Sequence, residues 1–243
     1  MKQNKYDDMA FFEKYSQMDR STKGLEAAGE WKTLESMLPD FRGRRILDLG
    51  CGFGWHCQYA VEHGAKKVVG VDISEKMLAE AKKRTDESIQ YLCSPIEDID
   101  FPCSSFDVVI SSLTFHYLAS FEDIVKKVKA LLVTGGDFVF SVEHPIFTAY
   151  GTQDWYYDQS GKILHFPVDN YFYEGKRSAI FLGQEIIKYH KTLTTYLNGL
   201  IQSGFEITGI VEPQPSEHLL HTVEGMTNEL RRPMMLIVSA KKK

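Results

Sequence analysis

Apolar and polar positions along the chain change their period near residue 40, and the change separates two kinds of structure. From Gly24 to Leu38 the apolar residues recur at close to helical spacing, which predicts a helix that ends before Pro39. Beyond it, short apolar runs alternate with stretches of helical period. The runs predict seven strands, at residues 45–49, 67–72, 89–92, 106–111, 137–142, 205–212 and 233–240. The stretches between them predict helices at 55–63, 75–84, 121–132, 190–202 and 216–230.

Strands that alternate with helices are typical of an α/β protein. Because crossovers between parallel strands are right-handed, the pattern predicts a doubly wound, mostly parallel seven-stranded sheet with helices on both faces. We expect one domain over residues 1–243. It would comprise N-terminal helices at 1–40, a ligand-binding core at 41–142, an inserted cap after the fifth strand at 143–188, and the rest of the core at 189–243.

The predicted cap, residues 143–188, breaks the alternation and is rich in aromatic residues. A loop of this length without structure is unusual, so we expect it to cover the strand ends, with a hairpin over 169–181 around Glu174 and Gly175. Its aromatic rings could line a pocket for a planar or cationic substrate, or form the core of the cap itself.

Composition and charge narrow the choice of partners. The 243 residues are 43% hydrophobic with a formal net charge of −5, which offers no basic surface for nucleic acid. We find no apolar run of 18 residues and no signal-peptide pattern, so neither a membrane span nor export is predicted, and the cytoplasm is the expected location. The four cysteines have neither zinc nor disulfide spacing, and no metal site is predicted.

The central motif is a glycine-rich loop between the first core strand and its helix. Asp48 leads the pattern D-x-G-x-G-x-G through Gly50 and Gly52, and Asp72 ends the next strand. Glycines let the backbone approach a ligand, and a carboxylate such as Asp72 can accept both hydroxyls of a ribose. A dinucleotide loop would have a small residue where Trp55 stands, whereas the leading acid suits a ligand with an ammonium group.

At this point the sequence resembles a known family. The blocks ILDLGCGFG (46–54), VVGVDIS (68–74) and SPIEDIDFPCSSFDVVISSLTFHYL (94–118) resemble, in this order, the motifs of class I S-adenosylmethionine-dependent methyltransferases, and the resemblance covers about residues 44–142. The segment 204–213 also resembles the end of that family's domain. The resemblance implies a Rossmann-like methyltransferase fold, with S-adenosyl-L-methionine as cofactor and S-adenosyl-L-homocysteine as product.

The resemblance also implies roles for individual residues. Gly50, Cys51 and Gly52 would form the loop along the methionine part of the cofactor, with Asp48 near its amino group and Asp72 on the ribose. The remaining contacts would be Ile73 and Met77 beside the adenine, Ile96 or Glu97 at its edge, and Ser111 beneath the methionine. Pro95 stands where the family often has an acid, and proline supplies neither a carboxylate nor a backbone N–H.

Catalytic residues give a weaker signal, because methyl transfer needs orientation and at most a base. Three histidines are candidates: His144 directly after the fifth strand, His116 after the fourth, and His190 at the start of a predicted helix. We expect His144 to face the substrate cavity. In the N-terminal segment, Tyr15 and Arg20 could contact the methionine carboxylate.

The sequence therefore predicts an enzyme that methylates a small molecule, as a monomer or homodimer, and that binds neither nucleic acid nor membrane. The alternatives are a methyltransferase-like protein that binds the cofactor without chemistry and, disfavoured by Trp55, a nicotinamide-dependent oxidoreductase. The acceptor and the methylated atom remain open.

Overall fold

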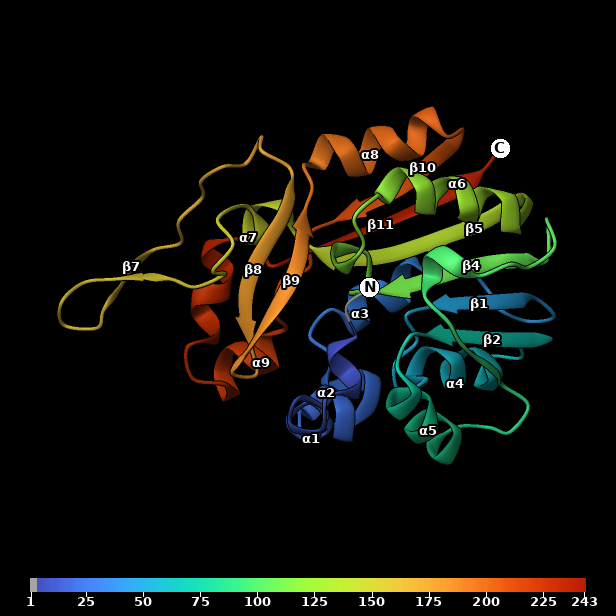
Figure 1. The fold of residues 1–243 in the computed structure, drawn as a ribbon, viewed down its shortest axis with the longest axis horizontal. Coiled ribbons are helices and arrows are strands. Elements are labelled where there is room, and N and C mark those ends of the chain that lie inside the picture. The colour runs from blue at the N-terminus through green and yellow to red at the C-terminus, as the bar shows by residue number, and fades with distance from the viewer. Residues whose placement is uncertain (1–3) are drawn as a thin grey trace.

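The computed structural model describes residues 4–243, and its centre is a seven-stranded sheet (Figure 1). The strands run in the order β10-β11-β5-β4-β1-β2-β3. All pairs from β5 to β3 are parallel, and β11 is antiparallel to both of its neighbours. Their bounds are β1 Arg45–Leu49, β2 Lys67–Asp72, β3 Gln90–Cys93, β4 Phe106–Ser112, β5 Leu132–Glu143, β10 Phe205–Val211 and β11 Met235–Lys242. The doubly wound, mostly parallel sheet predicted from the sequence is confirmed.

Helices cover both faces of the sheet (Figure 1). One face packs against α6 and α8, and the other against α3, α4 and α5. The α-helices are α1 Met9–Ser16, α2 Asp19–Thr22, α3 Trp31–Met37, α4 Trp55–Glu62, α5 Glu75–Arg84, α6 Phe121–Leu131, α7 Pro145–Ala149, α8 Leu193–Gln202 and α9 Glu217–Thr222. Short 3-10 turns are η1 Lys5–Asp7, η2 Gly24–Ala27, η3 Ile96–Asp98, η4 Phe115–Tyr117 and η5 Met226–Arg231. Across residues 4–243, no helix has the length and apolar character that crossing a membrane requires.

Two predicted helices are divided in the structure. The helix expected over 24–38 is a 3-10 turn followed by α3, and that expected over 216–230 is α9 followed by η5. Gly29 lies at the first break, and Gly225, with φ of +79°, lies at the second. Glycine costs helical stability in both places, so a periodic apolar pattern alone overestimated the length of these helices.

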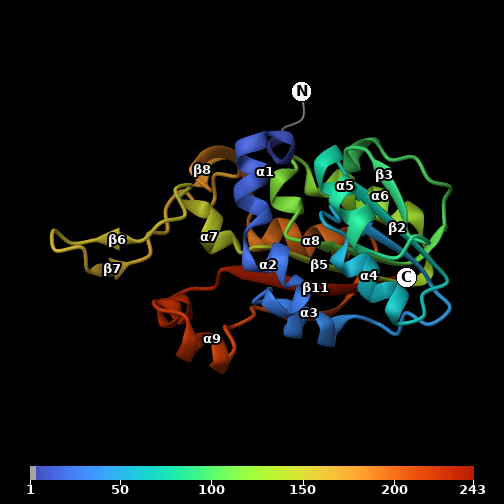
Figure 2. The same cartoon turned by 90° about the horizontal axis from the view of Figure 1, so that it is seen from below.

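The segment after β5 forms two hairpins, and the prediction of a hairpin over 169–181 is wrong. The larger hairpin joins β8 (Gly175–Phe181) to β9 (Gln184–His190). Leu182 and Gly183 make its turn with φ of +53° and +78°, because a two-residue hairpin loop matches the strand twist only when both residues are left-handed. The smaller hairpin, β6 (Tyr156–Tyr157) with β7 (Ile163–His165), projects away from the sheet (Figures 1 and 2).

The N-terminal helices hold the tip of the larger hairpin. Phe11 of α1 packs in one apolar cluster with Ala179 and Ile186 of the hairpin. Lys14 Nζ also donates to the carbonyl of Leu182 at 3.0 Å. Segments far apart in the sequence therefore lie together, with α1 next to β8 (Figure 2). We call α1 and the β8–β9 hairpin together the roof.

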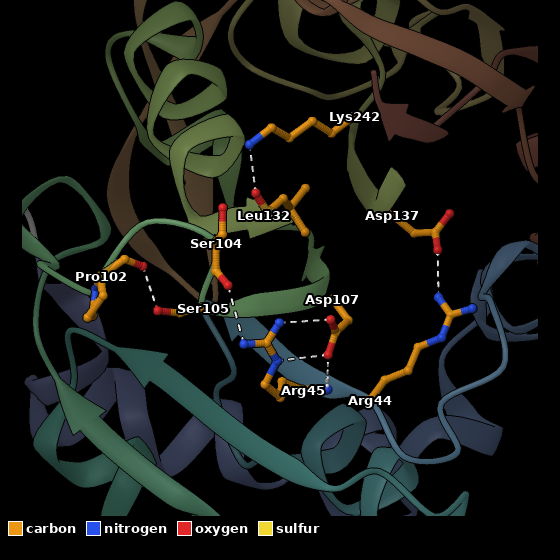
Figure 3. A network of polar contacts seen from close by, with 9 residues as sticks. All are labelled: Arg44, Arg45, Pro102, Ser104, Ser105, Asp107, Leu132, Asp137 and Lys242. Atoms are coloured by element: carbon orange, nitrogen blue, oxygen red, sulfur yellow. Dashed lines mark hydrogen bonds and ion pairs between the residues drawn. The ribbon is translucent and has the colours of Figure 1, made fainter. Parts of the chain in front are cut away.

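The amino ends of the strands are tied by ion pairs (Figure 3). Arg45, at the start of β1, holds Asp107 of β4 through two contacts of 2.9 Å, and Arg44 holds Asp137 of β5 at 2.8 Å. Hydrogen bonds from Arg45 keep the pKa of Asp107 below its usual value. These paired carboxylates connect neighbouring strands at the amino edge of the sheet. The cavity lies at the opposite, carboxyl edge.

Candidate active site

The glycine loop lies at the carboxyl edge of the sheet, at the end of β1 between β4 and β2. Gly50 and Gly52 have φ of +78° and +53°, a region that side chains other than glycine rarely adopt. A Cβ on Gly50 would lie 2.2 Å from Thr114 Oγ1, closer than any real contact. Both glycines line a cavity of about 950 Å³, so the backbone itself forms part of its wall.

Asp72 lines the same cavity from the end of β2. Its two oxygens accept from the backbone N–H groups of Gly52 and Ser74, each at 2.9 Å, which fixes the carboxylate against the glycine loop. Burial raises the pKa of Asp72 above its ordinary value. Four further residues predicted for the cofactor also line the cavity: Ile73, Met77, Ile96 and Glu97.

Three other predicted cofactor residues lie behind the loop and do not line the cavity: Asp48, Cys51 and Ser111. Ser111 donates its hydroxyl to the carbonyl of Leu49 at 2.7 Å, and Cys51 is buried. Asp48 is 1% exposed, its Oδ2 lies 3.4 Å from Cys57 Sγ, and its Oδ1 has no hydrogen-bond partner. Burial raises the pKa of Asp48 to about 7. The structure therefore makes these residues supports of the loop, and their contact with a cofactor stays a prediction.

Tyr15 of α1 and Arg20 of α2, the predicted N-terminal contacts, both line the cavity. Tyr15 packs edge-on against Tyr6 and Phe53. Arg20 pairs with the buried carboxylate of Glu30 at 2.9 Å, which orders its guanidinium.

His144 does not face the cavity, so that expectation is wrong. Its ring is fully buried at the start of α7, where Nδ1 accepts from the backbone N–H of Ile146 at 3.0 Å. On its other side, Nε2 lies 2.8 Å from Glu212 Oε1. Burial lowers the pKa of His144 despite this carboxylate. The imidazole acts as the N-cap of α7, as short polar side chains commonly do at helix starts, and it fixes the first turn of that helix.

His190 also lies outside the cavity, and it ends β9 instead of beginning a helix. Its Nδ1 lies 2.8 Å from the hydroxyl of Thr148, and its Nε2 lies 2.8 Å from the carbonyl of Tyr171. Both ring nitrogens are engaged in joining parts of the cap.

His116 is the predicted histidine that the cavity does include. It is 2% exposed, and its Nδ1 accepts from the backbone N–H of Glu143 at 3.3 Å. Burial lowers the pKa of His116 to about 4, against the opposing effect of Glu143. The imidazole is therefore neutral at neutral pH.

Sequence reasoning missed a charged cluster in the wall of the same cavity. Glu143 Oε1 lies 2.5 Å from Lys188 Nζ, and Gln153 bridges the two with contacts of 2.6 Å to each. Glu143 directly precedes His144, which was predicted to face the cavity, so that prediction was wrong by one residue. Lys188 and Gln153 come from the cap, where no motif signals them.

Comparison with known proteins identifies the family. Residues 47–140 match the model of a methyltransferase domain. A protein of Haemophilus influenzae without an assigned function is 35% identical over 98% of this chain and 96% of its own length. An S-adenosylmethionine-dependent methyltransferase structure from Mesorhizobium loti is 42% identical, with a TM-score of 0.83, over 90% of this chain and all of that one. A Listeria monocytogenes structure, described as a candidate enzyme of this class, is 54% identical over 90% of this chain and 99% of its own, with a TM-score of 0.86.

The chain belongs to the S-adenosylmethionine-dependent methyltransferases, and S-adenosylmethionine is its cofactor. The site fits that molecule. The glycine loop offers a cradle that a Cβ on Gly50 would disturb, and Asp72 presents a carboxylate at the cavity wall, where its contact with the ribose stays a prediction. The unpartnered Oδ1 of Asp48 lies behind the loop, and its effect on the amino group of the ligand stays a prediction. Among residues 4–243, no group of three metal-ligating side chains gathers at the cavity or elsewhere.

Proposed function

We propose that this methyltransferase acts on a small molecule bound in the cavity beneath the cap. The observation that carries the proposal is that one cavity of about 950 Å³ is lined both by the glycine loop and by residues of the segment after β5. This volume lies in the upper part of the range for cavities that hold small ligands, so the cavity suits a nucleoside cofactor together with a compact second molecule. The roof made by α1 and the β8–β9 hairpin favours an acceptor that the protein can enclose.

In this proposal, one set of lining residues binds the cofactor and the cap binds the methyl acceptor. The cofactor supplies an electrophilic methyl group. Gly50, Gly52 and Asp72 hold it with backbone and carboxylate contacts, aided by the other lining residues Tyr15, Arg20, Ile73, Met77, Ile96 and Glu97. The cap encloses the acceptor and excludes water, which strengthens the polar contacts inside.

The test separates small acceptors from large ones. A cell extract is passed through a membrane that retains proteins and nucleic acids, and both fractions are incubated with the enzyme and S-adenosylmethionine. We expect S-adenosylhomocysteine to form with the filtrate, and Asp72→Ala to serve as the inactive control. If only the retained fraction supports product formation, and nuclease or protease abolishes it, the small-molecule proposal is wrong.

A further inference from the structure

We propose that the methyl acceptor carries a neutral hydroxyl group, and that this hydroxyl binds between Glu143, Lys188 and His116. The inference rests on the proposed function, since it names the reacting group of the acceptor in the same cavity. All three residues line the cavity, and they come from β5, β9 and η4. Glu143 ends β5, His116 lies in η4 after β4, and β4 and β5 are neighbouring strands on one side of β1.

The cluster leaves one ammonium proton of Lys188 and one lone pair on each carboxylate oxygen of Glu143 free for a ligand. Lys188 Nζ has three protons and uses two, toward Glu143 and Gln153. Each oxygen of Glu143 has one such partner, at 2.5 Å from Lys188 and 2.6 Å from Gln153, and keeps a second lone pair. The carboxylate and the ammonium are 15% and 5% exposed, so bulk water does little to screen them.

His116 contributes a second hydrogen-bond donor to the cluster, and it does not act as a base because its Nδ1 is already occupied. Because its Nδ1 accepts from the backbone N–H of Glu143, the proton of the neutral ring sits on Nε2. That Nε2 lies 3.9 Å from Glu143 Oε1, too far for a direct hydrogen bond. The Nε2–H group therefore lies beside the carboxylate and can donate to a ligand oxygen placed between them.

The charge balance of the cluster selects the chemical class of the acceptor. The charges of Glu143 and Lys188 cancel, and His116 is neutral, so the cluster has no net charge that would attract a charged ligand. An ammonium placed here would face Lys188 and a carboxylate would face Glu143, and burying either charge without a partner is costly. A hydroxyl donates to Glu143 and accepts from Lys188 or His116, so it pairs with both the acceptor and the donors of the cluster. A thiol donates and accepts only weakly, so it gains less.

The surrounding wall fits an apolar body for the acceptor. It is formed by Tyr117, Phe147, Phe181, Ile186 and Met234, and Lys188 Nζ lies 6.0 Å from the ring centre of Tyr117. A phenol or another hydroxyl on an apolar frame matches both the wall and the cluster.

The cluster also has the parts that the reaction of a hydroxyl needs. The O–H bond breaks and its proton passes to Glu143 Oε, while an oxygen lone pair forms the new C–O bond. The C–S bond breaks and its electrons stay on sulfur, leaving S-adenosylhomocysteine, a methyl ether and a protonated Glu143. Burial acts to raise the pKa of Glu143, but the ammonium of Lys188 and the hydrogen bonds from Lys188 and Gln153 oppose it, and the pKa lies below its usual value. The carboxylate is thus ionised and ready to accept a hydrogen bond, and Lys188 stabilises charge that develops on the oxygen.

The first experiment identifies the methylated atom. The enzyme is incubated with the small-molecule filtrate and S-adenosylmethionine carrying a ¹³C-methyl group, and the labelled product is examined by NMR. We expect the methyl carbon to be bonded to oxygen. A methyl on nitrogen, sulfur or carbon overturns the hydroxyl inference and leaves the small-molecule proposal intact. If labelled methyl appears only in macromolecules, the proposed function itself fails and this inference fails with it.

A second experiment needs no turnover. The protein saturated with S-adenosylhomocysteine is titrated with p-cresol, 4-methylbenzylamine and p-toluate, which share an apolar body and differ in the polar group. We expect p-cresol to bind at least about tenfold more tightly than either charged probe, because a buried unpaired charge is penalised. ¹⁵N spectra should show His116 in the Nε2–H form, with its Nε2–H signal shifted by p-cresol.

Matched variants test the assignment of the cluster. Glu143→Gln should reduce the preference for p-cresol several-fold, whereas Glu185→Gln, the same change at an exposed position of β9, should leave it unchanged. Equal binding of the three probes, an equal preference in Glu143→Gln, or a His116 ring protonated on Nδ1 would each overturn the assignment.

Discussion

Replacing Asp48 by asparagine should raise the free energy of unfolding at pH 8 and raise it less at pH 5.5. Asp48 is almost fully buried, with one oxygen unpartnered and the other beside the thiol of Cys57. Burial raises its pKa from the ordinary value of 3.8 to about 7. The folded protein therefore holds the proton of Asp48 more tightly than the unfolded chain does. The stability that comes from this proton is fully present below about pH 4 and is lost as the pH rises to about 7.

The magnitude follows from the size of the pKa shift. A rise of about 3 units corresponds to about 4 kcal/mol over the whole window, at about 1.4 kcal/mol per unit. About half of the window lies above pH 5.5, so the gain from asparagine should differ by about 2 kcal/mol between pH 5.5 and pH 8. For a chain of this size that difference is roughly 4–8 °C in melting temperature.

The assay is calorimetric unfolding of the ligand-free protein at the two pH values. Wild type, Asp48→Asn and Asp100→Asn are compared, the last being a control at an exposed carboxyl in a loop. We expect Asp100→Asn to follow the pH dependence of wild type and Asp48→Asn to depart from it. If all three proteins show the same pH dependence, ionisation of Asp48 has no cost and the reasoning from burial is refuted.

Three further substitutions test the site and the cap. Asp72→Ala should weaken S-adenosylhomocysteine binding by roughly 1.5–3 kcal/mol in calorimetry, the scale of hydrogen bonds to a charged group, and unchanged affinity would remove it from the site. Gly50→Ala should abolish that binding because its Cβ meets Thr114 at 2.2 Å, whereas Gly43→Ala, where nothing lies within 4 Å, should retain it. Arg232→Ala should lower the free energy of unfolding by about 2 kcal/mol, since it removes contacts with three aromatic rings at 4.7–5.1 Å. Arg231→Ala, which removes a contact with one such ring, should lower the free energy of unfolding less. An equal loss in both variants would contradict the idea that the three ring contacts of Arg232 stabilise the cap.

The core could be predicted from the sequence because its signals are local. Strands such as β1 and β2 are short apolar runs bounded by turn residues, and the glycine loop and Asp72 lie at fixed offsets from them. Most of the predicted cofactor residues line the cavity for this reason. Asp48 and Cys51 belong to the glycine-loop motif and Ser111 to β4, but these three side chains lie behind the loop and outside the cavity lining, which no motif specifies.

The cap could not be predicted in the same way, because long-range contacts determine it. The turn at Leu182 and Gly183 is held by Lys14 of α1, and Glu174, expected in a hairpin turn, accepts hydrogen bonds from Thr192. The region also depends on Arg232, whose guanidinium lies among rings of the cap and pairs with Glu229. Partners this distant in sequence leave no periodic pattern, so the segment could be recognised as a cap while its hairpins could not be placed.

The choice between Glu143 and His144 illustrates the limit of such reasoning at a single residue. Successive side chains of a strand point to opposite faces, and Phe138, Phe140 and Val142 of β5 all lie in the cluster beneath α6 and α8. Alternation places Glu143 on the other face, with Ser141, whose hydroxyl reaches Ser112 of β4. The proline after His144 then starts α7 and turns the imidazole inward as its cap. A histidine at a strand end attracts attention as a base, but the face of the strand decides which of two neighbours meets the cavity, and here that residue is the carboxylate.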